Sequence, residues 1–307
     1  MRILVLGAGA IGGYFGGRLL DAGRDVTFLV RPERAKKLSK QGLSIQSASG
    51  DLHLTAPKTL LKENLREQFD LVILSCKAYD LDSSIDAIAP AIGPQTAVLP
   101  LLNGMRHLEV LDERLGSQHV LGGTCFISTR LEPNGSILHL SDVHIVRFGT
   151  RSPEQNDMAT NVSAALSGAG FEALQCENIL LDMWEKWIFL ASMAGLTCLL
   201  RGTIGDVAAA DGTDVAKALL DECREIATAA GYPPRPEAYQ FALERLTAPG
   251  SPIAASMLGD LERGGPTEGE HVLGDLLRRR KNPASPDLSL LRLATLHLRT
   301  GQIRSSK

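Results

Sequence analysis

The feature that most constrains this chain is a glycine-rich turn close to its start. An apolar run, Arg2–Leu6, leads directly into Gly7-Ala8-Gly9-Ala10-Ile11-Gly12, a G-x-G-x-x-G sequence that a helical pattern follows. In a dinucleotide-binding fold the first glycine allows a tight turn, the second leaves space for a pyrophosphate, and the third lets the helix approach the sheet. A second apolar run, 25–30, comes where the next parallel strand is expected. We therefore predict a Rossmann-type dinucleotide-binding unit rather than an isolated glycine turn.

The residue after the second strand bears on which dinucleotide is bound. An NAD site usually has Asp or Glu there to hold the ribose hydroxyls, whereas an arginine suits the 2′-phosphate of NADP. This chain has Arg31 at that position. We predict NADP(H) as the cofactor, with NAD as the alternative if Arg31 is only an exposed residue at a strand end.

Composition and charge narrow the class of protein. The chain has 307 residues, of which 44% are hydrophobic and 22% charged, as in soluble globular proteins large enough for two domains. A net charge of −3 gives no reason to expect a nucleic-acid partner, and the apolar stretches are too short to span a membrane. The cysteines lack a C-x-x-C pair, the histidines show no ligand spacing, and Met1 leads straight into a strand pattern. We expect a cytoplasmic protein without a signal peptide, disulfide framework or metal site.

The first half of the chain alternates strand and helix patterns. Near-continuous apolar runs at 70–76 and 97–102 are typical of strands that are buried on both faces of a parallel sheet. We predict further helices at 32–41 and 152–166, a hairpin at 43–46 and 52–55, short β segments over 120–150 around a turn at 132–135, and a last strand at 171–174.

Polar side chains follow the apolar runs where ligands bind in such folds. Lys77 follows one run and Asn103 follows the other. Because ligands lie beyond the carboxyl ends of parallel strands, we expect both residues to share one edge of the sheet with the glycine turn and Arg31. Thr124 and Thr129 come near where a fifth such position is expected. Taken singly, Lys77 or Asn103 could equally be a solvated loop residue.

The second half reads as helical. We predict a Rossmann domain at 1–174 and an all-α domain at 175–307, with the active cleft between them. The predicted helices are 177–200, 214–231, 236–246, 253–263, 267–280 and 289–299, with breaks at glycine or proline such as the one at Pro283–Pro286. The basic run Arg278–Lys281 is interpreted as a solvated helix end.

Lys186 is the strongest candidate for a catalytic residue in the helical half. It lies between Trp184 and Trp187 at the start of an apolar run. A lysine that loses hydration in such surroundings is a usable general acid near neutral pH. The alternative is that its side chain extends to solvent as the polar boundary of a buried helix.

Glu268 is the second candidate. It lies between Thr267 and Glu270, which have the spacing of a capping box, and this places it in the first turn of a helix. Compensation of the helix dipole is the alternative role for a carboxylate at that position.

These motifs, taken in order, resemble the ketopantoate reductase (2-dehydropantoate 2-reductase) family. The matching segments are the glycine turn, Arg31, Cys76-Lys77-Ala78-Tyr79, Leu102-Asn103-Gly104-Met105, Trp184-Glu185-Lys186-Trp187, Ser256-Met257-Leu258 and Pro266-Thr267-Glu268. The resemblance implies NADPH-dependent reduction of a 2-keto acid, which in the family is ketopantoate on the route to coenzyme A.

The resemblance also implies a role for individual residues. NADPH would be held by the glycine turn, Arg31, Lys77 and Asn103. Thr129 is a further candidate for cofactor binding because of its expected place at the edge of the sheet. Lys186 would donate the proton, Ser256 and Asn103 would bind the substrate, and Glu268 would lie where substrate and cofactor meet.

The chain departs from the family at the substrate wall. Where well-known members have asparagines four and eight residues after the catalytic lysine, this chain has Leu190 and Ala194, and it has Ile204 near a further one. Residues i, i+4 and i+8 share a helix face, so Leu190 and Ala194 should line the same wall as Lys186. We predict that the chemistry is kept while the substrate has a less polar tail.

Two other functions fit the same residues. The chain could be an NADP-binding sensor without turnover, although the presence of both Lys186 and Glu268 argues against this. It could also act in the oxidative direction as a hydroxy-acid dehydrogenase. The helical domain could supply a homodimer face.

Overall fold

The computed structural model describes residues 1–282 and 288–305, so the predicted break at Pro283–Pro286 lies outside the described residues. The chain divides into two compact units. Unit 1 comprises Met1–Leu102 and His107–Leu180, and unit 2 comprises Asn103–Arg106 and Leu181–Lys307. Unit 1 therefore ends a few residues beyond the boundary at 174 that the sequence suggested. The short loop Asn103–Arg106, which follows the apolar run 97–102, belongs to unit 2.

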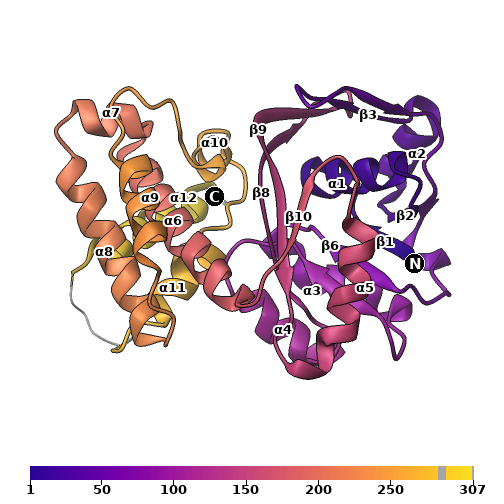
Figure 1. Ribbon diagram of the computed structural model, residues 1–307. Helices are drawn as coiled ribbons and strands as arrows, with labels where there is room; N and C mark the ends of the chain where they lie inside the picture. The colour runs from indigo at the N-terminus through magenta and orange to yellow at the C-terminus, as the bar shows by residue number, and fades with distance from the viewer. Residues whose placement is uncertain (283–287, 306–307) are drawn as a thin grey trace. The chain divides into compact units, whose positions relative to one another are not determined.

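Unit 1 is built on a parallel sheet with strand order β5-β2-β1-β6-β7 (Figure 1). Its strands are β1 (Arg2–Leu6), β2 (Asp25–Leu29), β5 (Thr59–Leu60), β6 (Leu71–Leu74) and β7 (Ala97–Pro100). Every residue of β6 and of β7 is buried, as expected for apolar strands covered on both faces. The Rossmann-type fold predicted from the glycine turn is confirmed.

Helices of unit 1 alternate with these strands. They are α1 (Ala10–Asp21), α2 (Pro32–Gln41), α3 (Leu81–Ile88), α4 (Arg106–Leu115) and α5 (Asn156–Leu166), with 3₁₀ turns at η1 (Lys62–Asn64), η2 (Ala78–Asp80), η3 (Ala89–Ala91) and η4 (Pro153–Gln155). The third glycine of the motif explains how closely α1 packs on the sheet. A Cβ at Gly12 would lie 2.4 Å from the Gly7 carbonyl oxygen and 2.4 Å from Ser75 Oγ. Any side chain at Gly12 would therefore push α1 away from β1.

A second sheet of unit 1 has the order β10-β9-β3-β4, and β8 pairs with β9. Its strands are β3 (Leu43–Gln46), β4 (Leu52–Leu54), β8 (Gly122–Leu131), β9 (Ile137–Gly149) and β10 (Glu172–Gln175). The prediction of short β segments over 120–150 was wrong, because β8 and β9 form one long antiparallel pair. The turn at 132–135 is confirmed by the Gly135 N–H, which donates to the Glu132 carbonyl at 2.8 Å.

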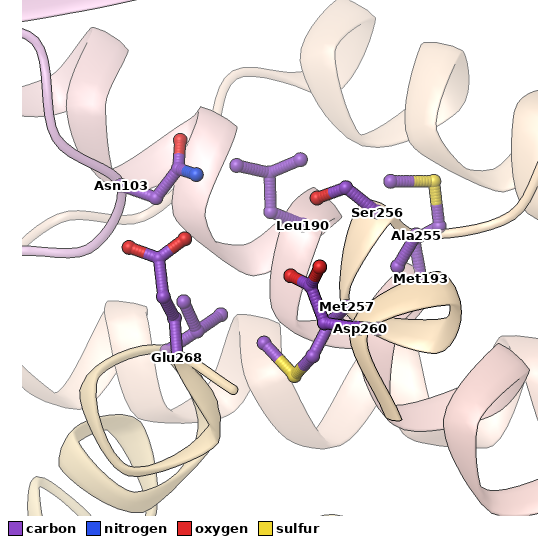
Figure 2. A pocket seen from close by; sticks show the side chains of 10 residues that line it. Asn103, Leu190, Met193, Ala255, Ser256, Met257, Asp260 and Glu268 are labelled. Atoms are coloured by element: carbon purple, nitrogen blue, oxygen red, sulfur yellow. The ribbon is translucent and has the colours of Figure 1, made fainter. Parts of the chain in front are cut away.

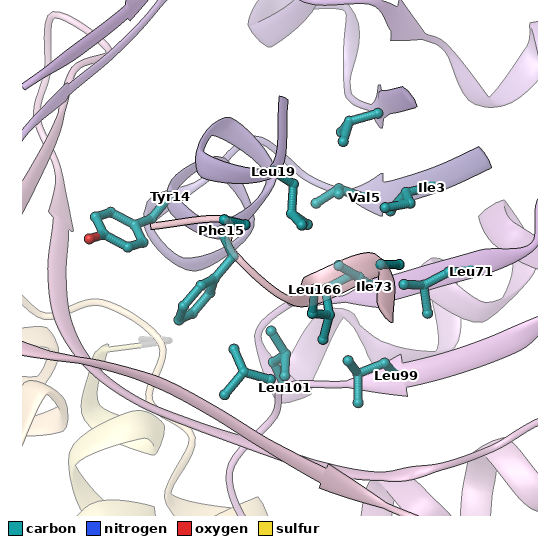
Figure 3. Close-up of a cluster of buried hydrophobic side chains, with 14 of the residues drawn as sticks. Ile3, Val5, Tyr14, Phe15, Leu19, Leu71, Ile73, Leu99, Leu101 and Leu166 are labelled. Carbon is teal, nitrogen blue, oxygen red and sulfur yellow. The ribbon is translucent and has the colours of Figure 1, made fainter. Parts of the chain in front are cut away.

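The core of unit 1 lies between α1, α5 and the parallel sheet (Figure 3). Phe15 from α1 makes an edge contact with Phe171, at a ring-centroid distance of 4.9 Å. Leu19 and Leu166 are almost fully buried beside the strands. The apolar face of α1 thus fixes its N-terminus, and with it the glycine turn, at the end of β1.

Unit 2 is helical over its described residues. Its helices are α6 (Ile179–Leu200), α7 (Ile204–Ala209), α8 (Thr213–Ala229), α9 (Pro236–Leu246), α10 (Ser256–Glu262), α11 (Asp275–Arg278) and α12 (Leu290–Ser305). The sequence reading missed α7, although Thr203 and Asp206 form a capping box at its start. Among the described residues, no helix is both long and apolar enough to cross a bilayer.

The predicted helix at 267–280 is not a continuous α-helix. Glu270–Gly274 forms a turn of π-helix, η5, that leads into α11. The expected capping box at Thr267 and Glu270 is also wrong, because the Glu270 carboxylate pairs with Arg299 and Arg278 instead. A π-helical turn adds a residue to the helix and is frequent at functional sites.

Candidate active site

The glycine turn of unit 1 has the form that a dinucleotide requires. Gly7 adopts a φ of 85°, which favours glycine, and its N–H donates to the Leu29 carbonyl at 2.8 Å. A Cβ at Gly9 would meet no atom within 4 Å, so this side of the turn is open. No side chain caps α1, which leaves the N–H groups of its first turn available to a phosphate. The residues present therefore fit a pyrophosphate.

Two predicted cofactor residues follow the carboxyl ends of strands in the parallel sheet. Arg31 follows β2 and its side chain is 79% exposed, with Nη2 3.1 Å from Asp80 Oδ1. Lys77 follows β6 and is also exposed. Thr129 does not have the expected position, because it lies within β8 of the second sheet and its hydroxyl oxygen is buried. Thr124, at the start of the same strand, is buried.

A pocket of unit 2 gathers most of the predicted substrate residues (Figure 2). The predicted residues that line it are Asn103, Leu190, Ala194, Ser256 and Glu268, and they are joined by Met193, Ala255, Met257, Asp260 and Val272. Figure 2 shows the Glu268 carboxylate directed toward the Asn103 side chain, with Ser256 farther along the pocket. Segments that are far apart in the sequence thus bring an amide, a hydroxyl and a carboxylate to one cavity.

Lys186 is not among the lining residues of this pocket, but it lies next to it. It is one turn before Leu190 on the same face of α6, and it is only 9% exposed. Most of its side chain is therefore packed inside the protein, and its role as the proton donor stays a prediction. Burial of an ammonium group requires compensating contacts, which is typical of a functional lysine.

The start of α6 is held by contacts on both sides of Lys186. Trp187 Nε1 donates to the Val272 carbonyl in the π-helix at 2.8 Å. The Arg279 guanidinium lies over the Trp184 and Trp187 rings, 5.9 and 5.5 Å from their centroids. The interpretation of the basic run as a solvated helix end therefore does not fit Arg279. These contacts fix α6 against the segment that carries Glu268.

Acidic residues of the same helix are neutralised away from the pocket. Asp182 and Glu185 both pair with Arg235, whose Nε donates to Glu185 at 2.8 Å. The Arg235 guanidinium therefore satisfies the two carboxylates that are nearest to Lys186 in sequence.

The wall that continues from Lys186 is apolar, as the sequence predicted. Leu190, Met193 and Ala194 form it, and Val272 adds an aliphatic side chain from the π-helix. Ile204 is fully buried and lies outside the lining, and its N–H donates to the Ile253 carbonyl at 2.8 Å.

Asp260 is a pocket residue that the sequence reading missed. It lies one turn after Ser256 on α10, so the two side chains share a helix face. Its Oδ1 accepts a hydrogen bond from Arg263 Nη2 at 2.8 Å. The i, i+4 spacing from Ser256 was the signal that could have identified it.

His271 was also missed, and it connects two walls of the pocket. It is buried in the π-helix, three residues after Glu268, and it hydrogen-bonds the backbone of Asn103. A Cβ at Gly104 would lie 3.1 Å from the His271 ring, so the loop packs tightly on the imidazole. Burial lowers the pKa of His271 from its ordinary value, and Glu268 and Asp275 oppose this shift. The imidazole is therefore neutral at physiological pH.

This lowered pKa predicts that the protein loses stability in acid. The unfolded chain binds a proton at His271 below about pH 6.5, while the folded chain resists it. The contribution of His271 to stability is thus complete above that pH and is lost as the pH falls below it. We expect the free energy of unfolding to drop less between about pH 7.5 and 5.5 in His271→Gln than in the wild type. Chemical denaturation at both pH values measures this, with His53→Gln as an exposed control, and an unchanged difference would contradict it.

Family profiles match both halves of the chain. The profile of the ketopantoate reductase PanE/ApbA family matches residues 3–152, and the profile of the PanE/ApbA C-terminal region matches residues 178–283.

Known proteins are similar over nearly the whole length. An uncharacterized oxidoreductase, YkpB, of Bacillus subtilis (strain 168) is 37% identical over 282 residues, with 92% of each chain covered. A 2-dehydropantoate 2-reductase of Mesorhizobium japonicum is 26% identical over 293 residues, with 87% of this chain and 88% of the relative covered. The structure of a D-mandelate dehydrogenase with NADH and anilino(oxo)acetate has a TM-score of 0.89 at 21% identity and full coverage of both chains, which shows the shared fold.

Proposed function

This chain belongs to the ketopantoate reductase PanE/ApbA family of oxidoreductases, and on that basis we propose that it reduces a 2-keto acid to a 2-hydroxy acid with NADPH. The observation that carries the proposal is the pocket of unit 2. Asn103, Ser256 and Glu268 line it, and the buried Lys186 lies one helical turn away from it. This combination supplies hydrogen-bonding groups for a keto acid and an ammonium group for its carbonyl oxygen.

We assign binding of the pyrophosphate and the 2′-phosphate of the coenzyme to unit 1. The open side of the glycine turn and the N-terminus of α1 accept the pyrophosphate, and Arg31 binds the 2′-phosphate. Lys77 adds a positive charge at the same edge of the sheet. When bound, the coenzyme supplies the hydride that reduces the carbonyl carbon. A D-mandelate dehydrogenase of this fold holds NADH, so the choice of NADPH depends on Arg31 rather than on the fold.

The protein residues then have separate tasks in the reaction. Ser256 and Asn103 hydrogen-bond the substrate and orient it. The Lys186 ammonium polarises the keto oxygen and delivers a proton to it as the carbon is reduced. Glu268 lies where substrate and coenzyme meet, and its carboxylate balances the charge of the ammonium group.

Because this wall of the pocket is apolar, we infer that the substrate has a less polar tail than ketopantoate. A pocket that lacks hydrogen-bonding partners for a hydroxyl gives up the discrimination that such partners provide. We expect kcat/KM for the deoxy analogue of ketopantoate to equal or exceed that for ketopantoate by up to about tenfold. Steady-state NADPH oxidation with both acids measures the ratio.

A double variant tests the same wall by making it polar. Leu190→Asn combined with Ala194→Asn restores amide groups and should shift the ratio toward ketopantoate, whereas Leu190→Val keeps the wall apolar and should leave it unchanged. A strong preference of the wild type for ketopantoate would contradict this substrate assignment.

Turnover itself decides between the reductase and the two other functions. NADPH oxidation over a panel of 2-keto acids supports the reductase, whereas tight NADPH binding without turnover of any member favours a sensor. The reverse assay with 2-hydroxy acids and NADP⁺ measures how readily the same site runs in the oxidative direction.

A further inference from the structure

The ion pair between Arg31 and Asp80 spans one end of the dinucleotide site. Arg31 follows β2, and Asp80 ends the 3₁₀ turn that follows β6. These two strands are not neighbours, because β1 lies between them and ends in the glycine turn. The pair, at 3.1 Å between Nη2 and Oδ1, therefore reaches across the edge of the sheet where the coenzyme is expected.

The two partners differ in how firmly they are held. The Arg31 side chain is 79% exposed, whereas that of Asp80 is 35% exposed. The backbone of Asp80 is held in its turn, since its N–H donates to the Lys77 carbonyl at 2.9 Å and its own carbonyl accepts from Ser83 Oγ at 2.9 Å. Arg31 can thus exchange partners by a change of rotamer, while the Asp80 carboxylate stays close by.

Such an exchange affects nucleotides that carry a 2′-phosphate differently from nucleotides that lack one. A 2′-phosphate carries more than one negative charge and competes with Asp80 for the guanidinium. Because Asp80 remains within a few ångströms, it also repels that phosphate. A nucleotide with a 2′-hydroxyl meets neither the competition nor the repulsion.

We propose that Asp80 is a coenzyme-selectivity residue, whose carboxylate shares the Arg31 guanidinium with the 2′-phosphate and so narrows the preference for NADPH over NADH. This inference depends on the proposed role of Arg31 in NADPH binding. The Asp80 carboxylate would weaken NADPH binding, because its negative charge disfavours a ligand that carries a 2′-phosphate.

Titration of the full-length protein with two nucleotides tests the proposal. The probe 2′,5′-ADP carries the 2′-phosphate, and 5′-AMP lacks it. We expect Asp80→Asn to bind 2′,5′-ADP about tenfold more tightly than the wild type, and 5′-AMP less than about twofold more tightly. The gain should shrink at high ionic strength, because salt screens exposed charges. Asp82→Asn removes an exposed carboxylate two residues away and should change neither affinity.

The remaining outcomes separate this proposal from the coenzyme assignment. If Arg31→Ala weakens 2′,5′-ADP but Asp80→Asn leaves it unchanged, the role of Asp80 is wrong and that of Arg31 stands. Equal gains for both nucleotides, or a loss of 5′-AMP affinity, would also overturn it, because Asp80 would then act on the adenosine itself. If Arg31→Ala affects the two nucleotides equally, the 2′-phosphate assignment fails and the inference fails with it.

Discussion

Replacing Lys186 with alanine is expected to lower kcat by about 10²- to 10⁴-fold while NADPH affinity stays nearly unchanged. Positioned acid catalysis supplies a factor of this size, and only the ammonium group of Lys186 provides it in this account. The affinity should be spared because the glycine turn and Arg31, to which we assign coenzyme binding, belong to the other unit of the chain.

Two further variants separate charge from packing at this position. Lys186 is buried, so its truncation leaves space in the protein. Lys186→Met fills most of that space without the ammonium group and should be as inactive as the alanine variant. Lys217→Ala removes a lysine that pairs with Asp221 on α8 and should keep full activity. Single-turnover and steady-state kinetics measure the effect, and an unchanged kcat in Lys186→Ala would remove this residue from the reaction.

Replacing Arg31 with alanine is expected to weaken NADPH binding by about 10- to 100-fold and NADH binding by less than about threefold. A hydrogen-bonded contact between a guanidinium and a phosphate accounts for a change of this size, and only NADPH has the phosphate at the 2′ position. Fluorescence titration of both coenzymes measures the two constants. Lys36→Ala removes an exposed cation of α2 and serves as the control. Equal losses for the two coenzymes would show that Arg31 does not recognise the 2′-phosphate.

Local patterns were sufficient to predict the dinucleotide-binding half. The apolar run before the glycine turn, the helix after it and the next strand each follow from residues that are adjacent in sequence. The predicted helix at 32–41 agrees with α2, and the buried runs agree with β6 and β7. Such elements are predictable because their burial depends on their own composition rather than on distant partners.

The long β8–β9 pair was harder to predict because its register is irregular. The pairing shifts between Ile127 and Thr129, opposite His144 and His139, which interrupts the alternation of apolar and polar residues. The sequence pattern therefore predicts several short segments where the structure has two long strands. Thr129 lies within β8 of this pair, and its role in cofactor binding stays a prediction.

The candidate site was predictable in part. Spacing on one helix predicted that Leu190 and Ala194 lie together, and the pocket contains both. Asp260 could have been identified from its i, i+4 spacing to Ser256 on the predicted helix 253–263. The contribution of His271 depends instead on a π-helical turn, which no local pattern predicted. Arg279 likewise belongs to a basic run, and only the fold reveals the two indole rings beneath it.

We propose that the ammonium group of Lys186 donates a proton to the keto oxygen of a substrate that receives hydride from NADPH. A crystal structure of the protein with NADP⁺ and a bound 2-keto acid measures this most directly. We expect Lys186 Nζ to lie about 3 Å from the keto oxygen, on the side of the pocket that Glu268 lines. An amine that points into bulk water, far from the carbonyl group and the nicotinamide ring, would contradict it.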